Sequence, residues 1–87
     1  MKIEIGKKYR VIDASRFEEE HKIENGHEFT VNSIDEDGDI WSNDISWNGI
    51  AGDGNDAPYV GWALLLIDYK EHCPESPADY SGAIEQV

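Results

Sequence analysis

The chain has 87 residues with 19 acidic and 7 basic side chains, a formal net charge of −12 and one cysteine. This length allows a single domain with a small core, and the charge excludes long-range attraction to nucleic acid or to an anionic membrane. The lone Cys73 excludes an internal disulfide, and the first residues lack the apolar segment of a secretory signal. The longest apolar run, residues 62–67, is too short to span a membrane, so we expect a cytoplasmic protein.

The first predicted strand precedes a short connection. Tyr9 and Val11 alternate with charged residues and would share one face of this strand. In the connection, Ser15 and Glu18 have the spacing of a helix capping box. The sequence therefore predicts a short helical turn over residues 16–21.

Residues 27–47 form the central element, which reads as two strands joined by an acidic turn. Before the turn, Phe29 and Val31 point to one face while their neighbours point to the other. The turn contains Gly38, the natural residue where a hairpin needs a positive φ. We expect the remaining chain to wrap around this hairpin.

The rest of the chain is less regular. A long loop over residues 48–58 separates the hairpin from a further strand at residues 59–62, and residues 67–71 would form a closing strand. Prolines at positions 74 and 77 prevent regular pairing after that point. We therefore predict a domain over residues 1–71 and a loosely ordered acidic tail over residues 72–87.

No pattern in the sequence indicates a catalytic, cofactor or metal site. The acidic turn has its glycine in the fourth position, whereas an EF-hand calcium loop has it in the sixth. The soft ligands do not have zinc-site spacing; they are His21, His27, His72 and Cys73. Neither a nucleophile elbow nor a serine triad is present, and the protein is expected not to be an enzyme.

Four large aromatic residues lie in or near the second half of the predicted domain: Trp41, Trp47, Tyr59 and Trp62. They have two readings. Two or three of them can simply fill the core. In an acidic setting, the same residues could also form a groove or cage that binds a peptide or a cationic ligand.

The order of strand and turn residues resembles the small SH3-like β-barrel proteins of bacteriophages and prophages. The match covers about residues 4–71, and the residues that carry it are Gly6, Tyr9, Val11, Ile23, Gly26, Asp37, Gly38, Asp39, Trp41, Trp62, Leu64 and Asp68. The loop at residues 48–58 and the chain after His72 depart from the pattern. The resemblance implies a mainly β, five-stranded SH3-like open barrel and a phage origin, but no catalytic residue.

The predicted function is that of a non-enzymatic, acidic protein-binding module. No Lys or Arg lies between Lys22 and Lys70. The acidity of this interval can simply keep a small protein soluble, or it can attract a basic partner. Small acidic phage proteins, some of them with Tudor- or SH3-like barrels, are known to imitate DNA and inhibit host DNA-acting proteins, so the resemblance supports the same expectation for this chain. We expect no cofactor, no direct contact with nucleic acid and no membrane contact. The expected partner-binding residues are Asp35, Glu36, Asp37, Asp39, Asp44, Asp53, Asp56, Trp41, Trp47 and Trp62.

Overall fold

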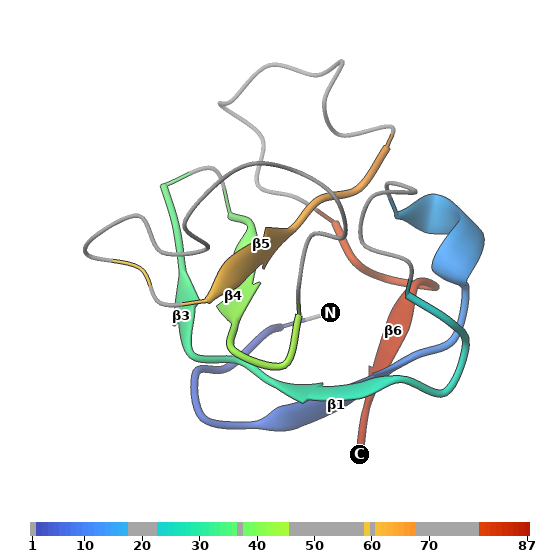
Figure 1. The fold of residues 1–87 in the computed structure, drawn as a ribbon, viewed down its shortest axis with the longest axis horizontal. Helices are drawn as coiled ribbons and strands as arrows, with labels where there is room; N and C mark the ends of the chain where they lie inside the picture. Colours follow the sequence, from blue (N-terminus) through green and yellow to red (C-terminus); the bar gives the residue numbers. More distant parts are fainter. Residues whose placement is uncertain (1, 18–22, 37, 46–58, 60, 68–78) are drawn as a thin grey trace.

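The computed structural model describes residues 2–17, 23–36, 38–45, 59, 61–67 and 79–87, and these residues are mainly β-structure. Within them, six short strands form two three-stranded antiparallel sheets (Figure 1). The single helical element of the described chain is one 3₁₀ turn. The mainly β prediction is therefore confirmed. In the same ranges, no helix has the length and apolarity needed to cross a membrane.

The first sheet has the strand order β2-β1-β6. Its strands are β1 (Lys8–Val11), β2 (Glu28–Thr30) and β6 (Ile84–Gln86). Tyr9 of β1 lies opposite Phe29 of β2, and Val11 of β1 lies opposite Ile84 of β6. All four side chains are buried, so one face of this sheet is apolar and turned to the core.

The second sheet has the strand order β3-β4-β5. Its strands are β3 (Ser33–Ile34), β4 (Ile40–Ser42) and β5 (Trp62–Leu64). Ile40 lies between Ile34 and Leu64, and together they form the core-facing row. The chain passes from β2 into β3 through Val31 and Asn32, so a single run of residues links the two sheets (Figure 1).

A common core joins the two sheets. It contains Tyr9, Val11, Phe17, Phe29, Val31, Ile40, Ile45, Leu64, Leu66, Tyr80, Ala83 and Ile84. The predicted alternation is confirmed: Tyr9 and Val11 of β1, Phe29 of β2 and Val31 directly after β2 are all buried. Since every second residue of a strand points to the same face, four apolar residues at this spacing were enough to identify the buried side.

The expected five-stranded open barrel is not confirmed. The described residues contain six strands in two separate sheets, and these do not close into a barrel. The strands have only two to four residues each, which limits how far a ladder of hydrogen bonds can extend around a core.

The prediction of a loosely ordered tail is wrong for residues 79–87. This segment ends in β6, and its Tyr80, Ala83 and Ile84 are buried in the core. The prolines on which the prediction rested precede the segment, whereas its own apolar residues supply enough burial to order it. The predicted boundary at residue 71 lies outside the described residues. Ile67, expected to begin a closing strand, lies in a turn instead.

The helical turn also differs from the prediction. It is the 3₁₀ helix η1 (Ala14–Arg16), and its N-cap is Asp13 rather than Ser15. The Asp13 carboxylate accepts a hydrogen bond from the Ser15 backbone N–H at 3.2 Å, as a capping aspartate does. Residues 18–22, where the turn was expected to continue, are outside the described residues.

Candidate functional site

The tip of the β3–β4 hairpin is built by backbone hydrogen bonds around Asp35. The Gly38 N–H donates to the Asp35 carbonyl at 3.0 Å, and the Asp35 N–H donates to the Asp39 carbonyl at 3.0 Å. Gly38 has φ +84°, as predicted. This is a backbone conformation that glycine adopts readily and residues with a side chain adopt rarely. The turn thus presents its residues at the end of the second sheet.

Two of the acidic residues expected to contact a partner are part of the turn itself. The Asp35 carboxylate accepts the Asp39 backbone N–H at 3.0 Å with one oxygen and the Trp41 indole N–H at 2.8 Å with the other. The Asp39 side chain is buried. An aspartate that begins a tight turn commonly accepts such bonds, and this is the sequence signal that the prediction missed.

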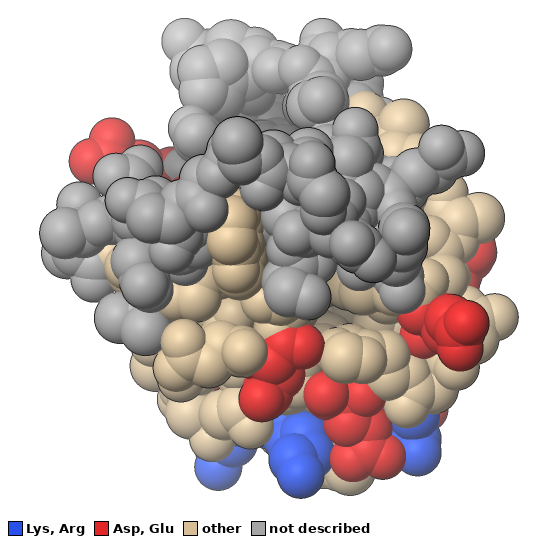
Figure 2. All heavy atoms as spheres, in the orientation of Figure 1, with Lys and Arg blue, Asp and Glu red and all other residues tan. Residues whose placement is uncertain are grey.

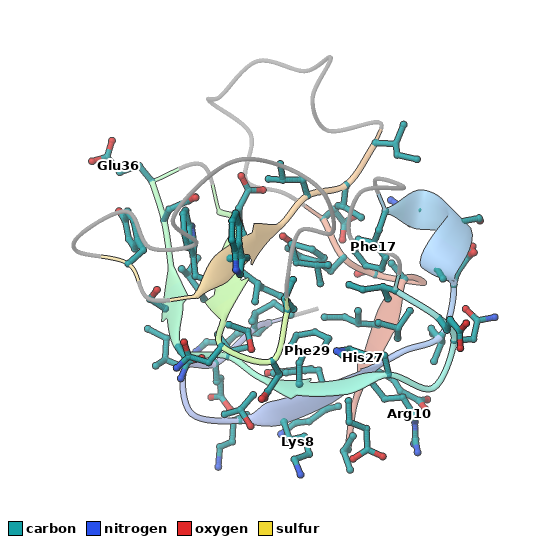
Figure 3. All side chains as sticks on the ribbon, viewed as in Figure 1. Lys8, Arg10, Phe17, His27, Phe29 and Glu36 are labelled. Atoms are coloured by element: carbon teal, nitrogen blue, oxygen red, sulfur yellow. The ribbon has the colours of Figure 1, made fainter. Side chains whose placement is uncertain are left out.

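Glu36 and Asp44 are the exposed members of the predicted acidic set among the described residues. Glu36 projects away from the end of β3 into solvent (Figure 3). Asp44 accepts the Thr30 backbone N–H at 2.9 Å through its carboxylate. Its carbonyl accepts a hydrogen bond from His27 Nε2 at 2.9 Å. Glu36 is therefore available for a partner, whereas Asp44 also ties the end of β4 to the first sheet.

The structure separates the aromatic residues that the sequence grouped. Trp41 stacks on Tyr59 with ring centroids 5.4 Å apart and an angle of 23° between the rings. Both residues are half-buried. Trp62 pairs with Ser42 and packs on the core, so it lies on the opposite face of the sheet from Trp41.

The neighbours of Trp41 across the sheet are small. Ser33 of β3 lies opposite Trp41 on one side, and Ala63 of β5 lies opposite it on the other. Trp41 itself is half-buried, so part of its ring remains exposed on this face. The Trp41–Tyr59 pair, the Asp35 carboxylate and Glu36 together form what we call the tip surface.

The charged residues are unevenly distributed along the chain. Residues 33–64, which include the whole second sheet, contain seven acidic side chains and no Lys or Arg. The first sheet carries Lys8 and Arg10 on β1, and the Arg10 guanidinium pairs with Glu85 of β6 at 2.9 Å. On the face shown in Figure 2, the visible Lys and Arg atoms lie at the lower edge of the molecule, and acidic atoms lie beside them. The segment that contains the second sheet therefore has no basic side chain of its own to compensate its negative charge.

The remaining predicted contact residues are Asp37, Trp47, Asp53 and Asp56, which lie outside the described residues. Over the part of the chain that the structure does describe, no three His, Cys, Asp or Glu side chains come together as metal ligands would. One carboxyl group there has a displaced pKa: hydrogen bonds from the Ser81 backbone N–H and hydroxyl lower the pKa of exposed Asp79. This carboxylate orders the turn before β6.

Comparisons with known proteins give no assignment: no family model matches the chain, and no curated protein or solved structure matches it significantly.

Proposed function

We propose that this protein is a non-enzymatic module that binds a basic protein partner through its second sheet. The observation that carries the proposal is the charge of the segment that contains the second sheet: residues 33–64 have seven acidic residues and no basic residue. Like charges gathered on a small domain repel one another and lower its stability. A partner with a basic groove offsets this repulsion, and its approach would be accelerated by the same field.

The sharpest form of the proposal is an inhibitor that imitates DNA. The partner would then be a DNA-acting protein, and this module would occupy the groove that normally holds the phosphate backbone. The resemblance to phage SH3-like proteins supports a bacterial host protein as that target. The direct run from β2 to β3 supports an SH3-like relation between the two sheets. A cytoplasmic setting suits a chain with one cysteine.

The test compares two variants that lose the same number of negative charges. The first neutralises acids of the second-sheet region: Glu36→Gln, Asp53→Asn and Asp56→Asn. The second neutralises exposed acids outside that region: Glu4→Gln, Glu24→Gln and Glu28→Gln. Asp35 and Asp39 are left unchanged, because their side chains are part of the hairpin turn.

Wild-type and variant proteins are immobilised and exposed to a bacterial extract, and the DNA binding of each captured protein is then measured. We expect a basic DNA-acting protein to bind the wild type and the second variant but not the first. Its affinity should fall as salt is raised, and its binding to DNA should be blocked. Equal capture by both variants, an unaffected DNA complex, or no specific capture would refute the proposal.

A second candidate function follows from the Trp41–Tyr59 pair. A module of this kind would bind a small cationic ligand or a peptide through the aromatic surface, without a DNA-acting partner. The half-buried state of both rings favours this candidate over a role confined to the core. A quaternary ammonium probe distinguishes it, as set out below.

A further inference from the structure

The orientation of the Trp41 ring is fixed on the outer face of the second sheet. Its indole N–H donates to the Asp35 carboxylate at 2.8 Å, and the ring stacks on Tyr59. A hydrogen bond to a carboxylate polarises the indole and makes its π face more negative. The ring is therefore held in one orientation with enhanced attraction for a cation.

The Asp35 carboxylate at the edge of the ring supplies a counter-charge for a cation. Glu36 is exposed next to Asp35, and no Lys or Arg occurs anywhere between Lys22 and Lys70. A cation on this ring must therefore come from elsewhere in the chain or from another molecule. Of the described basic residues, the two arginines have partners elsewhere: Arg10 of β1 pairs with Glu85, and Arg16 of η1 donates to the Ser81 and Asp79 carbonyls.

The geometry of the ring pair selects among cations. The two rings are nearly parallel with centroids 5.4 Å apart, so no cation fits between them. A trimethylammonium group needs rings that surround it, and Trp41 and Tyr59 do not provide that shape. A guanidinium is flat, weakly hydrated and able to stack on one aromatic face while it donates to a carboxylate.

We infer that the tip surface binds an arginine side chain of the protein partner, with its guanidinium stacked on the Trp41–Tyr59 pair and directed towards Glu36. The inference rests on the proposed function and names one side-chain contact between this protein and its partner. Arginine is abundant in surfaces that hold DNA phosphates, so a basic groove would supply it. The acidic residues would accelerate the approach, and the stacked arginine would fix the register of the complex.

The test uses three small probes on the whole protein: N-acetyl-arginine amide, N-acetyl-citrulline amide and tetramethylammonium. Citrulline has nearly the shape of arginine without its charge. The indole N–H resonance of Trp41, assigned with Trp41→Phe, is followed by NMR. Arginine should shift this resonance with millimolar affinity, and citrulline should leave it in place. Equal shifts by arginine and citrulline would overturn the inference, as would a larger effect of tetramethylammonium.

Two variants with matched charge locate the contact. Glu36→Gln should weaken arginine binding about two- to threefold, as expected when an exposed ion pair is lost. Glu28→Gln removes the same charge from β2 on the first sheet and should leave the affinity unchanged. Glu36 is exposed, so its substitution should not disturb the fold, which a thermal unfolding curve verifies. Equal losses in both variants would show only a general charge effect and would refute the inference.

The outcome is separable from that of the proposed function. If the second-sheet variant loses its protein partner while arginine leaves Trp41 unmoved, the inference fails and the proposed function stands. If arginine shifts Trp41 but no DNA-acting protein is captured, the proposed function fails, and the inference fails with it because it names that partner.

Discussion

Removing the hydroxyl group of Tyr80 should destabilise the fold more than its single oxygen atom suggests. This hydroxyl lies between two strands of the second sheet, where it accepts the Ile40 backbone N–H at 3.0 Å and donates to the Leu64 carbonyl at 2.5 Å. Ile40 and Leu64 are a cross-strand pair of β4 and β5. The residue is buried, so water cannot take the place of the missing group.

The magnitude follows from the two backbone groups left behind. Each buried group without a partner costs about 1–3 kcal/mol, and partial closure of the strands offsets part of this, so we expect Tyr80→Phe to cost about 2–4 kcal/mol. The aromatic ring remains, and its stacking on Phe17 should persist. For a domain of this size, such a loss lowers the melting temperature by roughly 10–25 °C.

The assay is urea unfolding followed by tryptophan fluorescence, with Tyr9→Phe as the control. The Tyr9 hydroxyl accepts one hydrogen bond, from the Glu4 N–H at 2.9 Å, and Glu4 is exposed. In the control, water can accept the Glu4 N–H in place of the missing hydroxyl. The free energy of unfolding should therefore fall by about 1 kcal/mol or less. If Tyr80→Phe loses no more than Tyr9→Phe, the hydroxyl does not hold the two strands together and the reasoning is wrong.

Three further predictions concern other parts of the fold. Gly61→Ala should cost about 3 kcal/mol or more in a denaturant titration, because Gly61 has φ +87° and an added Cβ would lie 2.1 Å from the Ser42 carbonyl oxygen; near-normal stability would contradict this packing. Phe29→Ala should cost about 3–5 kcal/mol, as for other fully buried phenylalanines, and a melting curve like the parent's would contradict the assigned register. The pKa of Asp79, measured by NMR titration, should lie below its ordinary value because Ser81 donates to its carboxylate; its contribution to stability is then present above the ordinary pKa and lost as the pH falls through the folded-state value. An Asp79 carboxyl that titrates normally would show that the turn is open in solution.

The sequence alone was sufficient to predict those features of the fold that depend on residues close together in the chain. The alternation of Phe29 and Val31 identified the buried face of β2, and Gly38 identified the hairpin turn. Both rest on local geometry: the two-residue period of a strand, and the left-handed conformation that glycine adopts readily. Information of this kind lies within a few residues of the position that it describes.

Features that depend on distant contacts were missed. The prolines before residue 79 gave a correct local reason against pairing, but they do not reveal that Tyr80 reaches Leu64 or that Ile84 pairs with Val11. Such pairing depends on which apolar surfaces remain uncovered after the other strands have assembled. It cannot be read from the composition of the segment alone.

The candidate site was predictable only in part for a related reason. Net charge counts every carboxylate equally, yet Asp35 and Asp39 belong to the turn while Glu36 faces solvent. The aromatic residues show the same limit, because Trp41 and Trp62 occupy opposite faces of one sheet. Which face each residue takes is set by strand register, and register is fixed by the whole sheet.

The position of β1 between β2 and β6 has a consequence for how the protein forms during synthesis. Arg10 of β1 and Glu85 of β6 face each other across 75 residues of chain. When a ribosome has released the chain only as far as β5, β1 still has an open edge, and the Ile40 N–H and Leu64 carbonyl still lack Tyr80. Such long-range closure slows folding and leaves strand edges open to misplaced pairing. A synonymous recoding that slows translation between β5 and β6 should therefore lower the yield of soluble protein, although the amino-acid sequence would be unchanged.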